Sequence, residues 1–232
     1  MTQDPKKIIE ATRQAYDTIA PHFDQTRRHQ YLAEFRWLEK LVSPGQELLD
    51  VGCGSGRLLE FLSGVTYTGI DLSPQLIRLA QEQHPECASQ FQVADMHALP
   101  FSDASFDRVV AISSLYHSPN RAFRQRVLRE IFRVLRPGGA VFLINWNGWQ
   151  KRFWKDRVRA FLAGHPSFFW IPWKSPQGEV QTQRFFSVLT KRQMRQDLQK
   201  AGFCDFQQMY VRHGIPAGVF RASNLLSIAR KA

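Results

Sequence analysis

A glycine-rich loop and two acidic residues stand at the ends of successive strands predicted from the sequence. The loop, residues 50–56 (DVGCGSG), follows a short apolar run and precedes a helix-like stretch. Glycines at such a turn permit positive φ and let a ligand approach the main chain. Asp71 and Asp95 end the next two predicted strands, where one carboxylate can accept hydrogen bonds from ribose hydroxyls and the other from an exocyclic amine of adenine. The three segments together predict one crevice that binds a nucleoside, although a helix-capping or solvated Asp71 is the alternative.

A histidine and a tyrosine follow the fourth predicted strand and face the same crevice. Tyr116 and His117 come shortly after residues 106–112, and ligands of open α/β sheets bind at the carboxyl ends of the strands. His117 can orient or deprotonate an acceptor there, or it can be a hydrogen-bonded wall residue. The remaining histidines are scattered, and we assign no metal site.

Strands and helices alternate along residues 47–146, which predicts a parallel sheet with right-handed crossovers. The Ser73-Pro74 pair starts one of these helices, because serine is a good N-cap and proline suits the first helical position. After residue 183 the pattern predicts a helix over 190–201 and a hairpin-like pair of strands. The predicted strands are a short apolar one in GQELLDV (residues 45–51), ending in the glycine loop, and residues 66–71, 91–94, 106–112, 140–146, 203–212 and 219–231, and the predicted helices are 57–62, from 73 onward, and 122–135.

Two segments interrupt the alternation and are expected to cover the crevice. Residues 5–42 have helical apolar spacing with a break at Ala20-Pro21, and we interpret residues 1–42 as an N-terminal helical lid. Residues 147–183 are rich in aromatic and basic side chains, and we interpret them as an insertion that forms a substrate cap. The whole chain, 1–232, is expected to be a single domain, since 232 residues suit one α/β domain.

Composition excludes some classes of protein and favours others. Hydrophobic residues make up 44% and charged residues 22% of the chain, and no apolar run reaches the roughly 20 residues that span a bilayer. We expect a cytoplasmic protein without a membrane partner, because the N-terminus lacks the apolar block of a secretion signal. Three well-separated cysteines argue against a disulfide scaffold or a zinc site. The net charge of +11 favours a polyanion such as RNA or an anionic surface, and solubility alone is the alternative.

Four segments in sequence resemble the class I S-adenosylmethionine-dependent methyltransferases: LLDVGCGSGRLL, GIDLS, VADMHALPFSDASFDRVVAISSLYH and REIFRVLRPGG. The resemblance covers about residues 16–146. It implies a Rossmann-like α/β fold with a seven-stranded, mostly parallel sheet, helices on both faces and an antiparallel last strand. It also implies S-adenosyl-L-methionine as cofactor. Tyr16 and Arg27, in the lid, are candidates for the cofactor carboxylate, with core packing and solvation as alternatives. The candidate cofactor-binding residues are Tyr16, Arg27, Asp50, Gly52, Cys53, Gly54, Gly56, Asp71, Leu72, Asp95, Met96 and Ser113, and the catalytic candidates are His117 and Tyr116.

The lid sequence IAPHFDQTR is similar to that of the tRNA methyltransferases that esterify carboxymethyluridine at the wobble position. That family has a His-His pair where this chain has Tyr116-His117, and an R-Y-Y-H segment where residues 184–187 read RFFS. The resemblance implies tRNA as the substrate and carboxylate O-methylation as the reaction, and some similar enzymes act with a small helper protein.

Two other functions stay open at this point. A methyltransferase acting on a small acceptor, such as a carboxylic acid, a quinone or a lipid precursor, would suit a closed pocket under residues 147–183. The third hypothesis is that the protein is a non-enzymatic, cofactor-binding subunit that supports a partner. The oligomeric state does not follow from the sequence.

Overall fold

The structure is a computed structural model, and it describes residues 4–232. Its centre is an eight-stranded sheet in the order β3-β2-β1-β4-β5-β10-β8-β9, with a separate two-stranded sheet of β6 and β7. β1 to β5 are parallel to one another, and β10 runs antiparallel between β5 and β8. The strands are β1 (Glu47–Val51), β2 (Thr66–Asp71), β3 (Phe91–Val93), β4 (Phe106–Ile112), β5 (Leu135–Trp146), β6 (Phe168–Lys174), β7 (Val180–Ser187), β8 (Cys204–Arg212), β9 (Ile215–Pro216) and β10 (Asn224–Arg230).

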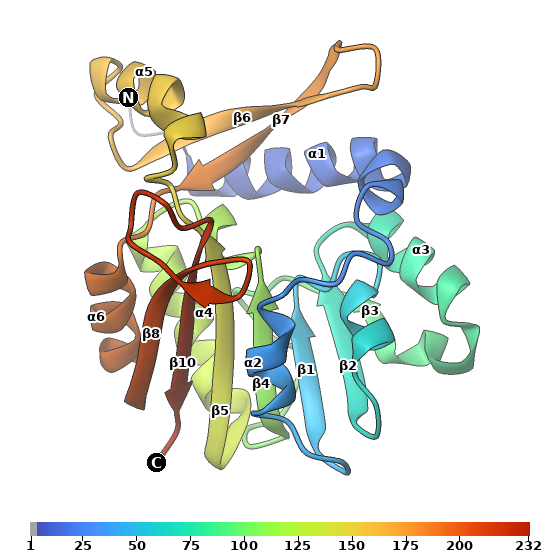
Figure 1. Ribbon diagram of the computed structural model, residues 1–232. Coiled ribbons are helices and arrows are strands. Elements are labelled where there is room, and N and C mark those ends of the chain that lie inside the picture. The colour runs from blue at the N-terminus through green and yellow to red at the C-terminus, as the bar shows by residue number, and fades with distance from the viewer. Residues whose placement is uncertain (1–3) are drawn as a thin grey trace.

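Helices cover both faces of the sheet, and others lie over its edge (Figure 1). The α-helices are α1 (Pro5–Gln25), α2 (Phe35–Glu39), α3 (Pro74–Gln83), α4 (Arg121–Val134), α5 (Trp154–Leu162) and α6 (Lys191–Ala201), and the 3₁₀-helices are η1 (Arg57–Phe61), η2 (Pro85–Gln90), η3 (Leu115–His117) and η4 (Lys151–Phe153). Side chains supply the caps: Ser73 accepts from the Leu76 amide, and Thr190 and Gln193 form a capping box at α6.

Each face of the sheet has its own apolar core. On one face, Val109 and Val141 pack with Ile131 of α4 and Leu198 of α6. The side chains on the other face include Leu48, Val110 and Phe142, which pack with α2 and α3. Because the central strands are covered on both sides, they are almost continuously apolar, as buried parallel strands are.

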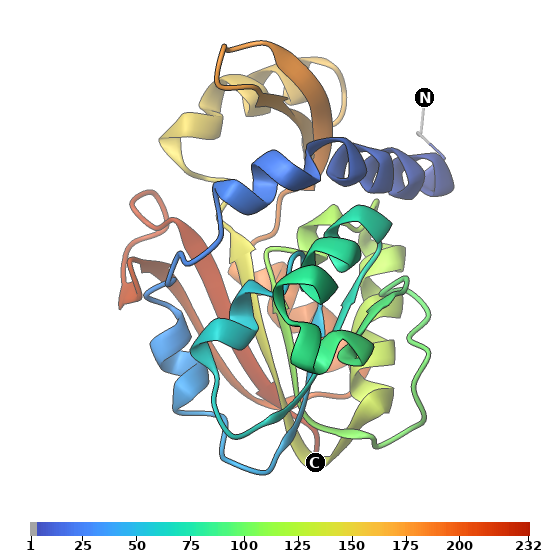
Figure 2. The ribbon, with the colours of Figure 1, turned by 90° about the vertical axis from the view of Figure 1, so that its right-hand side faces the viewer.

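The carboxyl edge of the parallel strands is covered by α1, the β6–β7 hairpin and α5. In Figure 1 the arrowheads of β1, β2 and β4 point toward α1, and the hairpin lies above it; Figure 2 shows the same order of layers from the side. The hairpin is antiparallel, with Phe168 paired with Ser187 at one end and Lys174 with Val180 at the other. Ligand sites of such sheets lie at this edge, so a ligand there would be enclosed between the sheet and these elements.

The predicted fold class is confirmed, and several boundaries differ. The eighth strand, β9, has only two residues and is paired with the end of β8. The helix α1 continues through Pro21, where we expected a break. Proline removes one helical hydrogen bond, but Ile19 and Ala20 before it and Asp24 after it are all buried, and this packing holds both sides of the helix in line.

Other boundaries shift by a few residues. β5 begins at Leu135, five residues before the predicted strand 140–146, and its register to β4 shifts in the added stretch. η1 is a 3₁₀-helix and not an α-helix, and β3 ends at Val93. Between α1 and β1 only α2 is α-helical, so residues 26–34 leave the expected helix. Residues 1–3 of the expected lid lie outside the described residues. No helix among residues 4–232 is long and apolar enough to cross a bilayer.

Candidate functional site

The glycine loop after β1 turns sharply because of its glycines and a close neighbour. Gly52 has φ +79°, and a Cβ there would lie 2.4 Å from the Ser114 Cβ, so no other residue fits without a shift of the backbone. The amides of Gly52 and Cys53 both donate to the Ile70 carbonyl, at 2.8 and 2.9 Å. Gly56, also at positive φ, packs beneath Phe91 instead of facing the ligand space, so its role is in the turn. The loop therefore holds main-chain groups against the carboxyl ends of β1 and β2.

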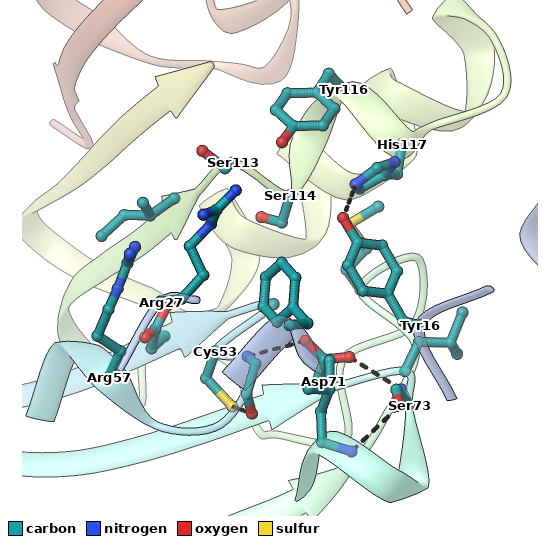
Figure 3. Close-up of a pocket in the computed structure, with 18 of the residues that line it drawn as sticks. Tyr16, Arg27, Cys53, Arg57, Asp71, Ser73, Ser113, Ser114, Tyr116 and His117 are labelled. Atoms are coloured by element: carbon teal, nitrogen blue, oxygen red, sulfur yellow. Dashed lines mark hydrogen bonds between the residues drawn. The ribbon is translucent and has the colours of Figure 1, made fainter. Parts of the chain in front are cut away.

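Asp71, the last residue of β2, is oriented toward this space by the backbone. Its Oδ2 accepts from the Gly54 amide at 3.0 Å and its Oδ1 from the Ser73 amide at 2.9 Å (Figure 3). Burial raises the pKa of Asp71, and the amide hydrogen bonds oppose that rise. Each carboxylate oxygen keeps a further lone pair, so Asp71 can accept from two neighbouring hydroxyl groups, as a ribose offers.

Asp50 lies under the loop and is held differently. Its side chain is 2% exposed, the Tyr67 hydroxyl donates to its Oδ2 at 2.8 Å, and its Oδ1 has no protein partner. Burial raises the pKa of Asp50 to about 7. An unpartnered buried oxygen is costly in a folded protein, so Asp50 is an acceptor that a bound ligand can satisfy.

Asp95 is held at the next loop by a histidine that the sequence reasoning did not single out. The backbone amide and the Nδ1 of His97 both hydrogen-bond Asp95 Oδ1, at 2.9 and 2.6 Å. Burial alone would raise the pKa of Asp95, but the hydrogen bonds from His97 outweigh it and lower that pKa. The second oxygen, Oδ2, stays available to a ligand, and Met96 lies beside it in the wall of the same cavity.

These groups line one cavity of about 360 Å³, within the range of small-molecule sites. Of the predicted site residues, only Gly56 does not line it. The predicted residues that do are Tyr16, Arg27, Asp50, Gly52, Cys53, Gly54, Asp71, Leu72, Asp95, Met96, Ser113, Tyr116 and His117. Ser113 has φ +58° although it is not glycine, and such strain gathers at functional sites.

Tyr16 and His117 form a polar pair between the lid and the sheet. The Tyr16 hydroxyl and His117 Nε2 are 2.9 Å apart (Figure 3), and His117 Nδ1 is 2.7 Å from the Phe185 carbonyl oxygen. A carbonyl only accepts, so Nδ1 carries the proton, and Nε2 accepts from the tyrosine. Burial lowers the pKa of His117 to about 3, and the nearby Arg184 adds to that effect. The imidazole is therefore neutral, with both nitrogens occupied.

Arg184 of β7 is the main residue that the sequence reasoning did not assign to the site. It is only 6% exposed, and its Nε has no hydrogen-bond partner. Among residues 4–232, no carboxylate oxygen lies within 4.0 Å of its guanidinium nitrogens. The guanidinium instead lies 4.7 Å from the ring centre of Trp173, and 5.8 and 6.0 Å from those of Trp146 and Tyr16. A buried cation without an anion is costly, so this part of the cavity is built for an anionic group.

Two further arginines line the cavity on the side of the glycine loop. Figure 3 shows Arg27 and Arg57 across the cavity from Tyr16 and His117. Arg27 is half-buried and packs its guanidinium near the rings of Phe23 and Trp173, at 5.8 and 5.9 Å. No carboxylate of the described chain pairs with either arginine within 4.0 Å. The cavity is thus lined both by carboxylates and by guanidinium groups that have no carboxylate partner within 4.0 Å among the described residues.

The missed residues had weak signals in the sequence. Arg184 stands in the segment that differs from the tRNA methyltransferase pattern, and its burial depends on the pairing of β6 with β7. His97 lies two residues after Asp95, a spacing that permits its Nδ1 and its amide to reach one oxygen. Arg57 directly follows the glycine loop and lines the cavity, a position that could have singled it out.

Comparison with known proteins identifies the domain. Residues 49–143 match the family described as "Methyltransferase domain". Over residues 49–143 the chain is therefore similar to methyltransferase domains. A solved S-adenosylmethionine-dependent methyltransferase from Methanosarcina mazei has the same fold, with a TM-score of 0.68 and 26% identity over 84% of this chain and 96% of that chain.

Two curated relatives act on different acceptors, according to their names. A tRNA (carboxymethyluridine(34)-5-O)-methyltransferase of Arabidopsis thaliana is 34% identical over 131 residues, which are 56% of this chain and 31% of that protein. A 2-methyl-6-phytyl-1,4-hydroquinone methyltransferase of Synechocystis is 36% identical over 149 residues, 59% of this chain and 46% of that protein. The chain spans less than half the length of both relatives.

Proposed function

We propose that this protein is an S-adenosylmethionine-dependent methyltransferase that esterifies a carboxylate, and that the carboxylate belongs to a modified uridine of tRNA. The observation that carries the proposal is the buried Arg184, which has no anionic partner and lies beside the neutral Tyr16–His117 pair. The cofactor, when bound, supplies an electrophilic methyl group on a sulfonium.

The cavity residues fit this cofactor. Asp71 keeps lone pairs for two ribose hydroxyls, and Asp95 Oδ2 is free to accept from the adenine amine. The unpartnered Oδ1 of Asp50 can accept from the cofactor's ammonium group. Arg27 and Arg57, near the glycine loop, are the cations available to its carboxylate.

A carboxylate acceptor suits the protonation states of the cavity. General base catalysis is needed only when the nucleophile carries a proton at neutral pH. His117 cannot serve as base, because its Nε2 already accepts from Tyr16 and burial lowers its pKa to about 3. Burial also raises the pKa of Tyr16, so the hydroxyl stays protonated. A carboxylate is already ionised, and Arg184 can hold one of its oxygens while the other reacts.

The assignment to tRNA has separate support. The lid resembles that of the tRNA enzymes, the net charge is +11, and a curated relative is named for carboxymethyluridine in tRNA. Tyr116 and residues 185–187 differ from the pattern of the tRNA methyltransferases. Two of these positions contact each other, since the Ser187 hydroxyl donates to the Tyr116 carbonyl at 2.8 Å. These residues therefore shape the wall and leave Arg184 as the polar group of β7 in the cavity.

The test is transfer of a tritiated methyl group to tRNA that carries carboxymethyluridine, compared with the same tRNA carrying uridine. A methyl ester releases labelled methanol in mild base, whereas methyl groups on nitrogen or carbon do not. We expect base-labile label only on the carboxymethyl tRNA, with loss in Asp71→Ala. Base-stable label would overturn the carboxylate assignment. The isolated chain is used first, and activity that needs an added small protein would identify the predicted helper.

A small carboxylic acid is the second candidate, and the cover over the cavity favours it. Trp173 of β6 donates through its Nε1 to His22 of α1 at 3.1 Å, so the hairpin and the lid meet above the cavity. The same assay with free carboxylic acids in place of tRNA distinguishes the two. A hydroquinone is less suited to this cavity, because its hydroxyl must lose a proton and neither Tyr16 nor His117 can take it.

A further inference from the structure

The helix α5 exposes an apolar stripe that no part of the described chain covers. Trp154, Val158, Phe161 and Leu162 are 66, 38, 70 and 78% exposed, and their spacing places them on one side of the helix. The opposite side packs inward through Ala160, which is 8% exposed. In Figures 1 and 2 this helix lies beside the β6–β7 hairpin, away from the central sheet. Contiguous apolar surface of this kind marks an interaction site.

Cations surround the stripe. Residues 151–162 contain five basic side chains and one acidic side chain, Asp156. Lys151, Lys155 and Arg159 are exposed. Among residues 4–232, no carboxylate oxygen lies within 4.0 Å of any of the five cationic groups. The guanidinium of Arg157 lies 3.6 Å from the ring centre of Trp149, so this cation is held against an aromatic face. The chemistry of the surface is therefore aromatic and cationic, which suits a polyanion with stacking bases.

This surface continues directly from the cavity. Arg152 of η4 lines the cavity, and its guanidinium lies 4.9 Å from the ring centre of Trp146. The helix α5 begins two residues later, at Trp154. A cavity of about 360 Å³ takes the cofactor and the reacting end of an acceptor, so the rest of a polymeric acceptor must lie outside it. A polymeric acceptor that leaves the cavity past Arg152 would meet α5 next.

We propose that η4 and α5 bind the single-stranded RNA on one side of the nucleotide being methylated, with bases stacked on Trp154 and Phe161 and phosphates paired with Lys151, Lys155 and Arg159. This rests on the proposed tRNA function and adds to it the surface that holds the RNA. Bases of a splayed loop are commonly read by aromatic stacking beside cations.

Two double variants test the proposal, both at exposed positions where the fold does not depend on the side chain. The first is Trp154→Ala with Phe161→Ala, and the second is Lys155→Ala with Arg159→Ala. The matched control is Lys191→Ala with Lys200→Ala, which removes the same charge from exposed positions of α6. Each is titrated against a fluorescein-labelled anticodon stem-loop RNA, and methyl transfer to tRNA is measured in parallel.

We expect the aromatic variant to weaken RNA binding at least about fivefold, the equivalent of about 1 kcal/mol. The charge variant should lower the slope of log affinity against log salt by about 1.4, since each phosphate contact to a single strand contributes about 0.7. The control should match the unmodified protein. Methyl transfer at limiting tRNA should fall in parallel, with little change at saturating tRNA.

The outcomes separate the two proposals. RNA binding that both double variants weaken, without any methyl transfer to tRNA, supports the RNA-binding role of α5 and overturns the proposed methylation of tRNA. Transfer to tRNA that neither variant weakens overturns the surface and leaves the function standing. Co-sedimentation with vesicles of phosphatidylglycerol and phosphatidylcholine, lost in the aromatic variant while RNA binding is unchanged, overturns it in favour of a membrane surface.

Discussion

Replacing Arg184 by methionine is expected to stabilise the ligand-free protein and to lower its rate of methyl transfer. The unpaired guanidinium is 6% exposed, and burial of one such charge costs several kcal/mol even after relaxation. The ring of Trp173, 4.7 Å away, returns about 0.5–2 kcal/mol. Methionine keeps the apolar stem without the charge, so we expect a net gain of about 2 kcal/mol. For a chain of this length, that raises Tm by about 4–8 °C.

Calorimetry of the ligand-free variant and the methyl-transfer assay measure the two effects. Loss of a charge pair with the acceptor carboxylate should lower transfer at least about 30-fold, since truncating one partner of a buried charge pair costs 2–5 kcal/mol. The control is Arg192→Met, at an exposed position of α6, which should change neither quantity. A fall in Tm for Arg184→Met would refute the reasoning, because it would show that the guanidinium is satisfied by the protein itself.

The remaining predictions concern protonation and the glycine loop. Because burial lowers the pKa of His117 to about 3, the rate of methyl transfer should show no histidine limb between pH 5 and 9, and a limb near pH 6.5 that disappears in His117→Gln would contradict this. The unfolded chain protonates that histidine below about pH 6.5, so its contribution to stability falls as the pH decreases from there toward 3, which urea titrations at several pH values can measure. Burial raises the pKa of Asp50 to about 7, so the folded state keeps a proton that the unfolded chain releases near pH 4, and the stability from this group falls as the pH rises from about 4 to 7 and is level above that. Asp50→Asn should therefore stabilise the protein more at pH 8 than at pH 5, by about 3 kcal/mol, and an equal change at both values would argue for an ionised Asp50 throughout. Gly54→Ala should cost about 1–2 kcal/mol for its positive φ, whereas Gly52→Ala should cost more because its Cβ would meet the Ser114 Cβ at 2.4 Å, and denaturant titration of the pair tests that order.

Local patterns were enough to predict the sheet and to bring Asp71 and Asp95 to one cavity. Strand-then-loop units with Asp71 and Asp95 at their ends follow the general geometry of parallel sheets, so residues distant in sequence could be placed together. The helix through Pro21 was not predictable, because burial of Ala20 and Asp24 against other elements decides it. The two-residue β9 depends on its pairing with β8 and carries no pattern of its own.

The part of the cavity around Arg184 and His117 depends on contacts that no local pattern contains. Arg184 enters the cavity only because β7 pairs with β6 above the sheet. The neutral state of His117 follows from its burial, and its tautomer is fixed by the Phe185 carbonyl, which is 68 residues away in the chain. Neither the hydrogen bond nor the burial could be inferred from Tyr116-His117 as a dipeptide, and this is why the sequence left the roles of base and positioning residue open.

The lid helix α1 is joined to three separate elements around the cavity. Asp17 accepts from the Ser73 hydroxyl at 2.6 Å, Tyr16 donates to His117, and His22 accepts from Trp173. We expect a cofactor bound between α1 and the glycine loop to leave only when these three contacts open. The residence time of the demethylated cofactor is then set by the opening of this helix, so successive turnovers should be slower than the first. Rapid-quench measurement of a product burst equal to the concentration of sites would show it.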